Sequence, residues 1–305
     1  MMQVTFLGTS AALPTVDRNV SAFMLQREGE LLLFDCGEGT QRQMMRYGAG
    51  FAMEDIFFSH YHSDHTLGLP GLLRSLGMMA RTAPLRIYGP RGAHKQLGQL
   101  VALGLERVKF PVEIIELTPG QVIARGDYEI QVGEANHRGD CLAYAVVEHD
   151  RLGRFDPELA KTLGIQEGPL WGRIHKGESV TLENGRVVAA AELVGPARPG
   201  RRVTYSGDSA PTDAMLHLAA GADLLIHEAT FGEDERERAL ETMHSTAREA
   251  ATVAMEAGVR RLALTHISAR YTREAPELLA EAKAVFEATV IARDGMTIDV
   301  PYRSA

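Results

Sequence analysis

The 305-residue sequence contains only two cysteines and one tryptophan, and it lacks any long apolar run. Cys36 and Cys141 lie far apart, a pattern typical of a reducing compartment, and we expect both to be thiols in the core. Polar residues or glycine interrupt every hydrophobic run well before the roughly 20 apolar residues that a membrane helix needs. The first residues show no signal-peptide pattern. These absences predict a soluble, cytoplasmic protein with no membrane association.

The sequence also lacks an excess of basic residues. Its formal net charge is −8, which argues against a protein that binds nucleic acid over its whole surface, because such proteins carry a basic footprint. That charge includes no bound metal. Any function on RNA therefore requires positive potential in a limited region.

Apolar runs and helical patterns alternate along the chain, and the composition, 45% hydrophobic, is sufficient for a large core. The pattern predicts strands at 4–7, 31–35, 55–59, 85–88, 128–132, 142–147, 203–206, 224–227 and 262–265, and helices at 67–79, 92–105, 246–257 and 276–288. Thr246 and Glu249 form a capping-box pattern that marks the start of the third helix. The mixture predicts a layered α/β or α+β fold. The length fits one large domain or two smaller ones, and the family resemblance described below implies a single domain, 1–305.

One segment, residues 150–177, interrupts this rhythm. It contains Trp171, the only tryptophan, and five basic residues against four acidic ones. A helix-like piece is expected at 157–163. Long loops within compact domains are usually functional or disordered, so we expect this locally basic segment to be one or the other.

Four side chains of metal-ligand type fall within six residues: His60, His62, Asp64 and His65. They follow an apolar strand and precede a helical pattern. Alternation places His60 and His62 on one side of an extended chain, and the turn into the helix directs Asp64 and His65 to a second point. Imidazole and carboxylate ligands suit Zn²⁺, with Mn²⁺ as the alternative. An ordinary polar loop is the competing interpretation, but it would rarely gather four such residues.

Three further candidates end strand-like runs: His137, Asp208 and His266. A carboxylate such as Asp208 can bridge two cations, which a histidine cannot do. Taken alone, each histidine is equally consistent with an ordinary polar residue. Together with the cluster, they predict a two-metal hydrolytic site.

The spacing His60-x-His62-x-Asp64-His65 resembles the signature of the metallo-β-lactamase superfamily. That resemblance implies an α/β fold, an αβ/βα four-layer sandwich with a dinuclear site at one edge of its two sheets. Finer motifs resemble ribonuclease Z, the tRNA 3′-endonuclease: Phe34-Asp35-Cys36-Gly37-Glu38-Gly39-Thr40-Gln41, His227-Glu228-Ala229-Thr230-Phe231, His244-Ser245-Thr246 and His266-Ile267-Ser268-Ala269-Arg270-Tyr271. Gly168-Pro169-Leu170, followed by Lys176-Gly177, is similar to the flexible arm of that family, which implies that residues 150–177 are an inserted arm that binds tRNA.

The resemblance implies which residues carry the activity. One Zn²⁺ is held by His60, His62 and His137, the second by Asp64, His65 and His266, and Asp208 bridges the two. A metal-activated water would attack the precursor tRNA and leave a tRNA 3′-hydroxyl and a trailer with a 5′-phosphate. The arm, with Gly168, Pro169 and Lys176, would grip the tRNA elbow. In this family the arm of one protomer serves the active site of the other, which implies a homodimer.

Several roles have more than one interpretation. Asp64 is either a proton acceptor from the attacking water or a ligand only. Glu228 and His244 either donate a proton to the leaving oxygen or orient a metal ligand. Ser268 and Arg270 are expected to hold a substrate phosphate, although Arg270 is also compatible with an ordinary surface position. Two competing functions are a small-molecule hydrolase of the same fold and a tRNA-binding protein with structural metals.

Overall fold

The computed structural model describes residues 1–104, 107–182, 184–271 and 274–303. The chain forms two compact units, one of Met1–Val147 and Arg202–Pro301, the other of Glu148–Arg201 and Tyr302–Ala305. The end of the helix expected at 92–105 lies outside the described residues. No helix in the described part of the chain is long and apolar enough to cross a membrane.

Two seven-stranded sheets form the centre of the larger unit. The first has the order β18 (Thr297–Asp299), β1 (Met2–Gly8), β3 (Ala22–Arg27), β4 (Glu30–Phe34), β5 (Asp55–Phe57), β6 (Leu85–Gly89) and β7 (Val112–Glu116). β18, β1, β3 and β4 pair in antiparallel fashion, whereas β4 to β7 are parallel.

The second sheet has the order β17 (Thr289–Ile291), β15 (Leu262–Thr265), β14 (Leu224–Glu228), β13 (Arg202–Tyr205), β10 (Leu142–Glu148), β9 (Tyr128–Glu134) and β8 (Val122–Ala124). The four strands from β13 to β17 are parallel. A short parallel pair, β2 (Ser10–Ala11) with β16 (Ile267–Ser268), joins the loops near the ends of the two sheets.

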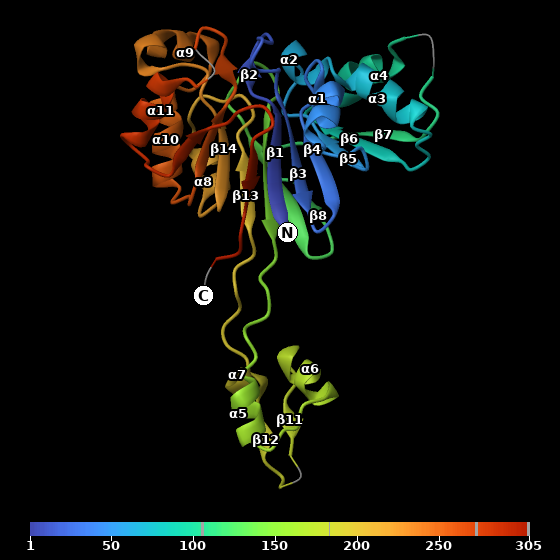
Figure 1. The fold of residues 1–305 in the computed structure, drawn as a ribbon, viewed down its shortest axis with the longest axis vertical. Coiled ribbons are helices and arrows are strands. Elements are labelled where there is room, and N and C mark those ends of the chain that lie inside the picture. The colour runs from blue at the N-terminus through green and yellow to red at the C-terminus, as the bar shows by residue number, and fades with distance from the viewer. Residues whose placement is uncertain (105–106, 183, 272–273, 304–305) are drawn as a thin grey trace. The chain divides into compact units, whose positions relative to one another are not determined.

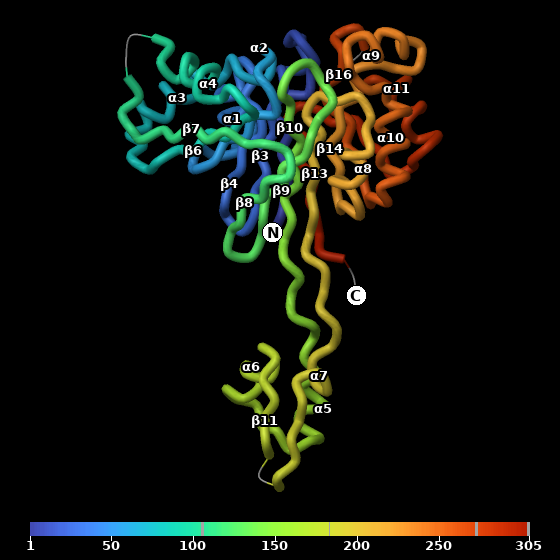
Figure 2. Tube along the Cα trace, turned by 180° about the vertical axis from the view of Figure 1, so that it is seen from behind, coloured from blue at the N-terminus to red at the C-terminus, as the bar shows by residue number. Residues whose placement is uncertain are grey.

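Helices cover the outer face of each sheet (Figures 1 and 2). The first sheet carries α1 (Thr40–Tyr47), α3 (Leu69–Met78) and α4 (Ala93–Ala102), and the short α2 (Ser63–Thr66) precedes α3. The second carries α8 (Asp213–Ala219), α10 (Ala247–Glu256) and α11 (Pro276–Lys283), with α9 (Arg236–Thr242) after the 3-10 turn Glu233–Glu235. The predicted four-layer αβ/βα sandwich is confirmed.

Alternating side chains along each strand separate the core into three layers, because successive residues of a strand face opposite sides of the sheet. In β4, Leu32 and Phe34 face the core between the two sheets, whereas Leu33 faces the helices. In β14, Ile226 faces the intersheet core and Leu225 faces the α8 and α10 side. The burial of both faces explains why these strands are almost wholly apolar.

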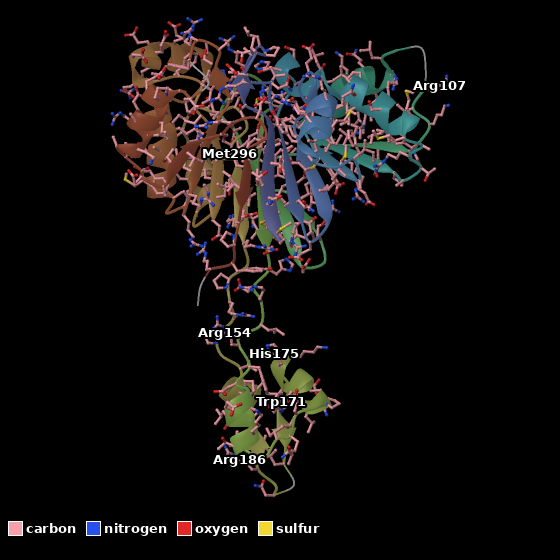
Figure 3. All side chains as sticks on the ribbon, viewed as in Figure 1. Arg107, Arg154, Trp171, His175, Arg186 and Met296 are labelled. Carbon is pink, nitrogen blue, oxygen red and sulfur yellow. The ribbon has the colours of Figure 1, made fainter. Side chains whose placement is uncertain are left out.

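The smaller unit has a separate core. It contains α5 (Pro157–Thr162), α6 (Pro169–His175), α7 (Ala190–Leu193) and the hairpin β11 (Val180–Thr181) and β12 (Val187–Val188). Its buried side chains are Ala160, Ile165, Ile174, Val180, Val188 and Leu193. Trp171 packs against this cluster and donates its indole N–H to the carbonyl of Ile165. Figure 3 shows Trp171 and His175 within this unit. The segment expected to be an arm, 150–177, lies within it.

Candidate metal centre

The seven expected ligands come from segments that follow four strands of the larger unit. The cluster from His60 to His65 follows β5, His137 follows β9, Asp208 follows β13, and His266 follows β15. Because β13, β14 and β15 are parallel neighbours, their carboxyl ends meet at one sheet edge, where sites form in α/β folds. His266 adopts a left-handed backbone with φ of 55°, a conformation uncommon outside glycine.

The structure brings all seven side chains together in two adjacent sets. His60, His62, His137 and Asp208 each place one ligand atom within 4.8 Å of the others, and so do Asp64, His65 and His266. Asp208 belongs to the first set, yet its Oδ2 also lies 3.4 Å from Nε2 of His65 and 3.2 Å from Nε2 of His266. The carboxylate of Asp208 therefore lies between the two sets, where it can serve both.

Hydrogen bonds at Nδ1 orient the imidazoles. His65 Nδ1 lies 2.8 Å from Oδ2 of Asp35, and His137 Nδ1 lies 2.9 Å from the carbonyl of Met243. Both partners only accept, so Nδ1 carries the hydrogen, and Nε2 is the nitrogen left to bind a metal when the ring is neutral. Such outer contacts are the usual way in which proteins fix the tautomer of a metal-binding histidine.

Two hydroxyl groups extend this pattern. Ser59 Oγ donates to Asp35 and lies 3.0 Å from Nδ1 of His60, whose N–H it can therefore accept. Thr230 Oγ1 donates to Glu228 and lies 2.8 Å from Nδ1 of His266. The lone pairs of both histidines are consequently placed on Nε2, the nitrogen nearest to Asp208.

Several polar atoms at the centre have no hydrogen-bond partner among the described residues. They are Nε2 of His60, Nε2 of His65 and Oδ1 of Asp208. All three residues are at most 2% exposed. Unpaired buried polar atoms are costly and call for an explanation. Bound cations supply one, since neutral imidazole nitrogen and carboxylate oxygen are ligands for divalent transition metals. The residues present fit a divalent metal site.

The carboxylates of the centre are ionised. Burial opposes the charge of Asp208, but His266, His65 and His60 outweigh it and hold the pKa of Asp208 well below its usual value. For Asp64, burial is likewise outweighed, chiefly by His65 and His266, and the pKa is lowered. Oδ2 of Asp64 accepts the backbone N–H of Ala12 at 2.8 Å. At neutral pH both side chains are therefore available as metal ligands or proton acceptors.

Glu228 and His244 form a pair beside the centre. Glu228 is wholly buried, and its Oε1 lies 2.7 Å from Nδ1 of His244. Burial disfavours a charged His244, but the Glu228 carboxylate outweighs this effect and raises the pKa of His244 to about 9. Glu228 also accepts the backbone N–H of Ser209 and the hydroxyl of Thr230. His244 thus carries a proton at neutral pH and lines the same pocket as Asp64 and Asp208.

The pocket over the centre has a volume of about 390 Å³. Ser268 and Arg270 line it, as expected for residues that hold a substrate phosphate. However, the guanidinium of Arg270 forms an ion pair with Glu235 at 2.6 Å and lies 5.6 Å from the centre of the Phe231 ring. Arg270 is at the pocket, but a neighbouring carboxylate already neutralises it.

The expected arm residues lie in the smaller unit. Gly168 precedes α6, Pro169 is its first residue, and Lys176 follows its last turn. Other cations of the unit are paired, as in the contact of Arg173 with Glu178 at 2.6 Å. Lys176 and Arg154 are exposed and form no ion pair within the described part of the chain. Arg151 also forms no ion pair with the described residues, but it is half-buried and its guanidinium lies over the Tyr302 ring. Lys176 and Arg154 are therefore the exposed cations without an ion pair in the segment 150–177.

Sequence reasoning missed the residues that orient the ligands: Asp35, Ser59 and Thr230. Asp35 is wholly buried and, besides His65, receives hydrogen bonds from Ser59 and from the hydroxyl of Tyr205 at 2.7 Å. The sequence did contain a signal for Asp35, because a charged residue directly after an apolar strand is rarely buried unless it is paired. Asp35 contacts His65 and Thr230 contacts His266 across 30 and 36 residues of sequence, so these two contacts were not predictable, whereas Ser59 contacts its neighbour His60.

Comparison with known proteins finds relatives that match nearly the whole chain. The family model "Anti-Pycsar protein Apyc1" matches residues 2–147, and the model "Beta-lactamase superfamily domain" matches residues 174–267. A protein named Ribonuclease Z from Gemmatimonas aurantiaca is 58% identical over 97% of this chain and 95% of its own length. Another of that name, from Myxococcus xanthus, is 51% identical over 99% of both.

Solved structures agree with this result. The short form of human tRNase Z superposes with a TM-score of 0.71 at 29% identity, covering 98% of this chain and all of that one (100%). The metallo-β-lactamase fold protein YhfI of Bacillus subtilis has a TM-score of 0.68 at 22% identity, covering 97% of this chain and 98% of its own. The similarity to YhfI shows only that the two proteins share a fold.

Proposed function

This chain belongs to the ribonuclease Z family, and on that premise we propose that it removes the 3′ trailer from precursor tRNA. The observation that carries the proposal is the position of Asp208 between two ligand sets, with His244, hydrogen-bonded to Glu228, in the same pocket. This arrangement suits hydrolysis of a phosphodiester. An RNA substrate of this kind also implies a cytoplasmic location.

We assign the metal ligands as expected from the sequence, with Zn²⁺ as the preferred ion and two ions per subunit. His60, His62 and His137 would hold one ion, Asp64, His65 and His266 the other, and Asp208 would bridge them. When bound, such an ion pair supplies a water nucleophile of lowered pKa and stabilises charge on the phosphoryl oxygens. Elemental analysis of the purified protein, with a stoichiometry of two zinc ions per chain, is the direct test.

Side chains of the protein would carry out the two proton transfers of the reaction. The ionised Asp64 accepts a proton from the attacking water, and the bond between phosphorus and the 3′-oxygen breaks. His244, held by Glu228, donates its proton to that oxygen. The tRNA then ends in a 3′-hydroxyl, and the phosphate stays on the 5′ end of the trailer. Positioned proton donors contribute roughly 100-fold to 10,000-fold in rate.

The primary experiment incubates the holoenzyme with a 3′-extended tRNA precursor, with and without chelator. We expect one endonucleolytic cut that chelator abolishes and zinc restores. His244→Asn should lower kcat by about 100-fold or more while the metal content stays at the wild-type level. A wild type that leaves the precursor intact but hydrolyses a thioester or lactam would favour the small-molecule hydrolase, and binding without cleavage would favour the tRNA-binding protein.

We propose that the arm binds the precursor away from the cleavage site, and that Gly168 and Pro169 serve this role by forming the start of α6. Arg154 and Lys176 support this role because their charges are not neutralised within the described chain. Phosphate contacts by such cations release counterions, so the affinity falls as salt rises. Arg154→Gln combined with Lys176→Gln should raise KM for the precursor and leave kcat unchanged. Arg173→Gln, at a paired cation of the same segment, is the matched control.

We further propose a homodimer in which the arm of one protomer serves the other's active site. Subunit mixing tests this directly. A variant lacking residues 151–176 retains its catalytic centre, and Asp64→Ala retains its arm. If the arm acts in trans, mixed dimers regain cleavage that neither variant shows alone. If subunits have exchanged between the two variants and the mixture still does not cleave the precursor, the arm does not act in trans.

A further inference from the structure

Two arginines at the catalytic pocket have no assigned role. Arg138 directly follows the expected ligand His137, and Arg238 lies on α9; both line the pocket over the metal centre. Both are exposed, and neither forms an ion pair within the described part of the chain. They differ in this respect from Arg270, which pairs with Glu235.

The contacts of the two guanidinium groups leave most of their donors free. Nη2 of Arg138 makes one long hydrogen bond, 3.4 Å, to the carbonyl of Glu241. The Cζ atom of Arg238 lies 6.0 Å from the centre of the Phe231 ring, a contact that restrains the side chain without using its N–H groups. Each guanidinium has five N–H donors in a fork that matches phosphate oxygens.

The acids of α9 lie outside the lining of the catalytic pocket. Of the residues of α9, only Arg238 and Thr242 line the pocket over the metal centre. Glu237 and Glu241 do not line this pocket; they border an adjoining hollow that Arg238 and Thr242 also line. The protein as a whole is acidic, with a net charge of −8. Arg138 and Arg238 therefore add two guanidinium groups without an ion pair, within the described residues, to the lining of this pocket, where they can contact a polyanion.

We propose that Arg138 and Arg238 bind phosphates that flank the scissile bond in the single-stranded 3′ region of the RNA substrate. This inference rests on the proposed function and adds a substrate-binding rim to the same site. The metal centre can engage one phosphodiester, whereas an RNA strand continues on either side. Cations supplied by two separate elements can hold that strand at neighbouring phosphates and select polynucleotides over small diesters.

The proposal makes a quantitative prediction about salt. Each phosphate contact to a single strand contributes about 0.7 to the slope of log affinity against log salt concentration. Arg138→Gln and Arg238→Gln should each reduce the slope by about that amount. KM for the precursor should rise by roughly tenfold for each charged hydrogen-bonding group removed, with kcat within about twofold of wild type. Arg238→Lys retains the charge and should retain the slope.

The experiment compares the holoenzyme and its variants on a 3′-extended tRNA precursor and on bis(p-nitrophenyl) phosphate, which has no flanking phosphates. Hydrolysis of the small diester and the metal content should be unchanged in both glutamine variants. Arg236→Gln is the matched control, since Arg236 lies on the same helix, outside this pocket. Unchanged salt slopes, or an equal loss on both substrates, would overturn the proposal.

A failure of the proposed function gives a different result. In that case the wild type does not cut the precursor, and the arginines are judged by binding of a single-stranded oligoribonucleotide, measured by fluorescence anisotropy at several salt concentrations. A lower slope in Arg138→Gln and Arg238→Gln supports the rim. Equal slopes for wild type and variants refute it.

Discussion

Asp35 is the residue on which the orientation of the centre most depends. Its carboxylate accepts hydrogen bonds from His65 and from the hydroxyl of Ser59, and that hydroxyl also contacts Nδ1 of His60. One buried charge therefore orients histidines of both ligand sets. The sequence predicts all seven ligands because their types and strand-end positions are visible in it. It does not predict Asp35 in this role, since the role depends on Ser59 and Tyr205, which only the fold brings into contact.

Asp35→Asn should weaken metal binding while keeping the side-chain volume. The amide cannot supply the charge that orients His65, and loss of such an outer contact typically lowers metal affinity about 10-fold to 100-fold. Competition with a chromogenic chelator measures the change. Tyr205→Phe, which removes one donor to Asp35, should act in the same direction with a smaller effect.

The control for this change is Asp127→Asn. Asp127 is an exposed carboxylate that pairs with Arg27, so its replacement should not alter metal affinity. An Asp35→Asn protein that folds and binds metal as tightly as wild type would contradict the assigned role.

The two cysteines should remain unreactive in the folded protein at alkaline pH. Burial raises the pKa of both the Cys36 and Cys141 thiols to about 12, and only the thiolate is an effective nucleophile. At pH 9 about one molecule in a thousand would carry a given thiolate, whereas an unfolded cysteine with a pKa of about 8.5 is mostly ionised. Titration with a disulfide reagent should detect no fast thiol in the native protein and two in urea.

At the scale of elements, the sequence predicts those whose signals are local. Each predicted strand occurs, within one or two residues at most ends, because apolar runs between turn residues show buried strands directly. The capping box at Thr246 and Glu249 is confirmed. By contrast, α1 was missed, because it begins after Gly39, which has no side chain to cap it. The helix expected at 276–288 ends at Lys283, since helical propensity alone does not mark an end.

Thr246→Ala should destabilise the protein by about 1 kcal/mol. Oγ1 of Thr246 accepts the N–H of Glu249 at 3.2 Å, and Glu249 in turn accepts the N–H of Thr246 at 2.9 Å. The substitution leaves the N–H of Glu249 without its partner. Urea unfolding at fixed metal concentration measures the loss. Thr252→Ala, within the same helix, removes only a bond to the Arg248 carbonyl and should be near neutral or stabilising, because alanine favours helix.

At the scale of the molecule, the candidate centre depends on both sheets. β5 belongs to the first sheet, and β9, β13 and β15 belong to the second. The order of the candidate ligands along the chain therefore does not reveal which sheet carries each of them. The spacing from His60 to His65 could not show that the site draws on both sheets. Bound cations would connect the two halves of the sandwich at one edge.

Removal of metal should therefore lower the unfolding temperature of the larger unit. An ion that binds only the folded state stabilises it by about 4 kcal/mol when its free concentration is a thousandfold above Kd. Calorimetry with and without chelator should show a lower transition for the stripped protein that zinc reverses in a concentration-dependent way. Asp208→Ala removes the carboxylate common to both ligand sets, so its transition should respond much less to chelator. Equal transitions for stripped and zinc-loaded wild type would mean that the centre binds no ion strongly enough to connect the sheets.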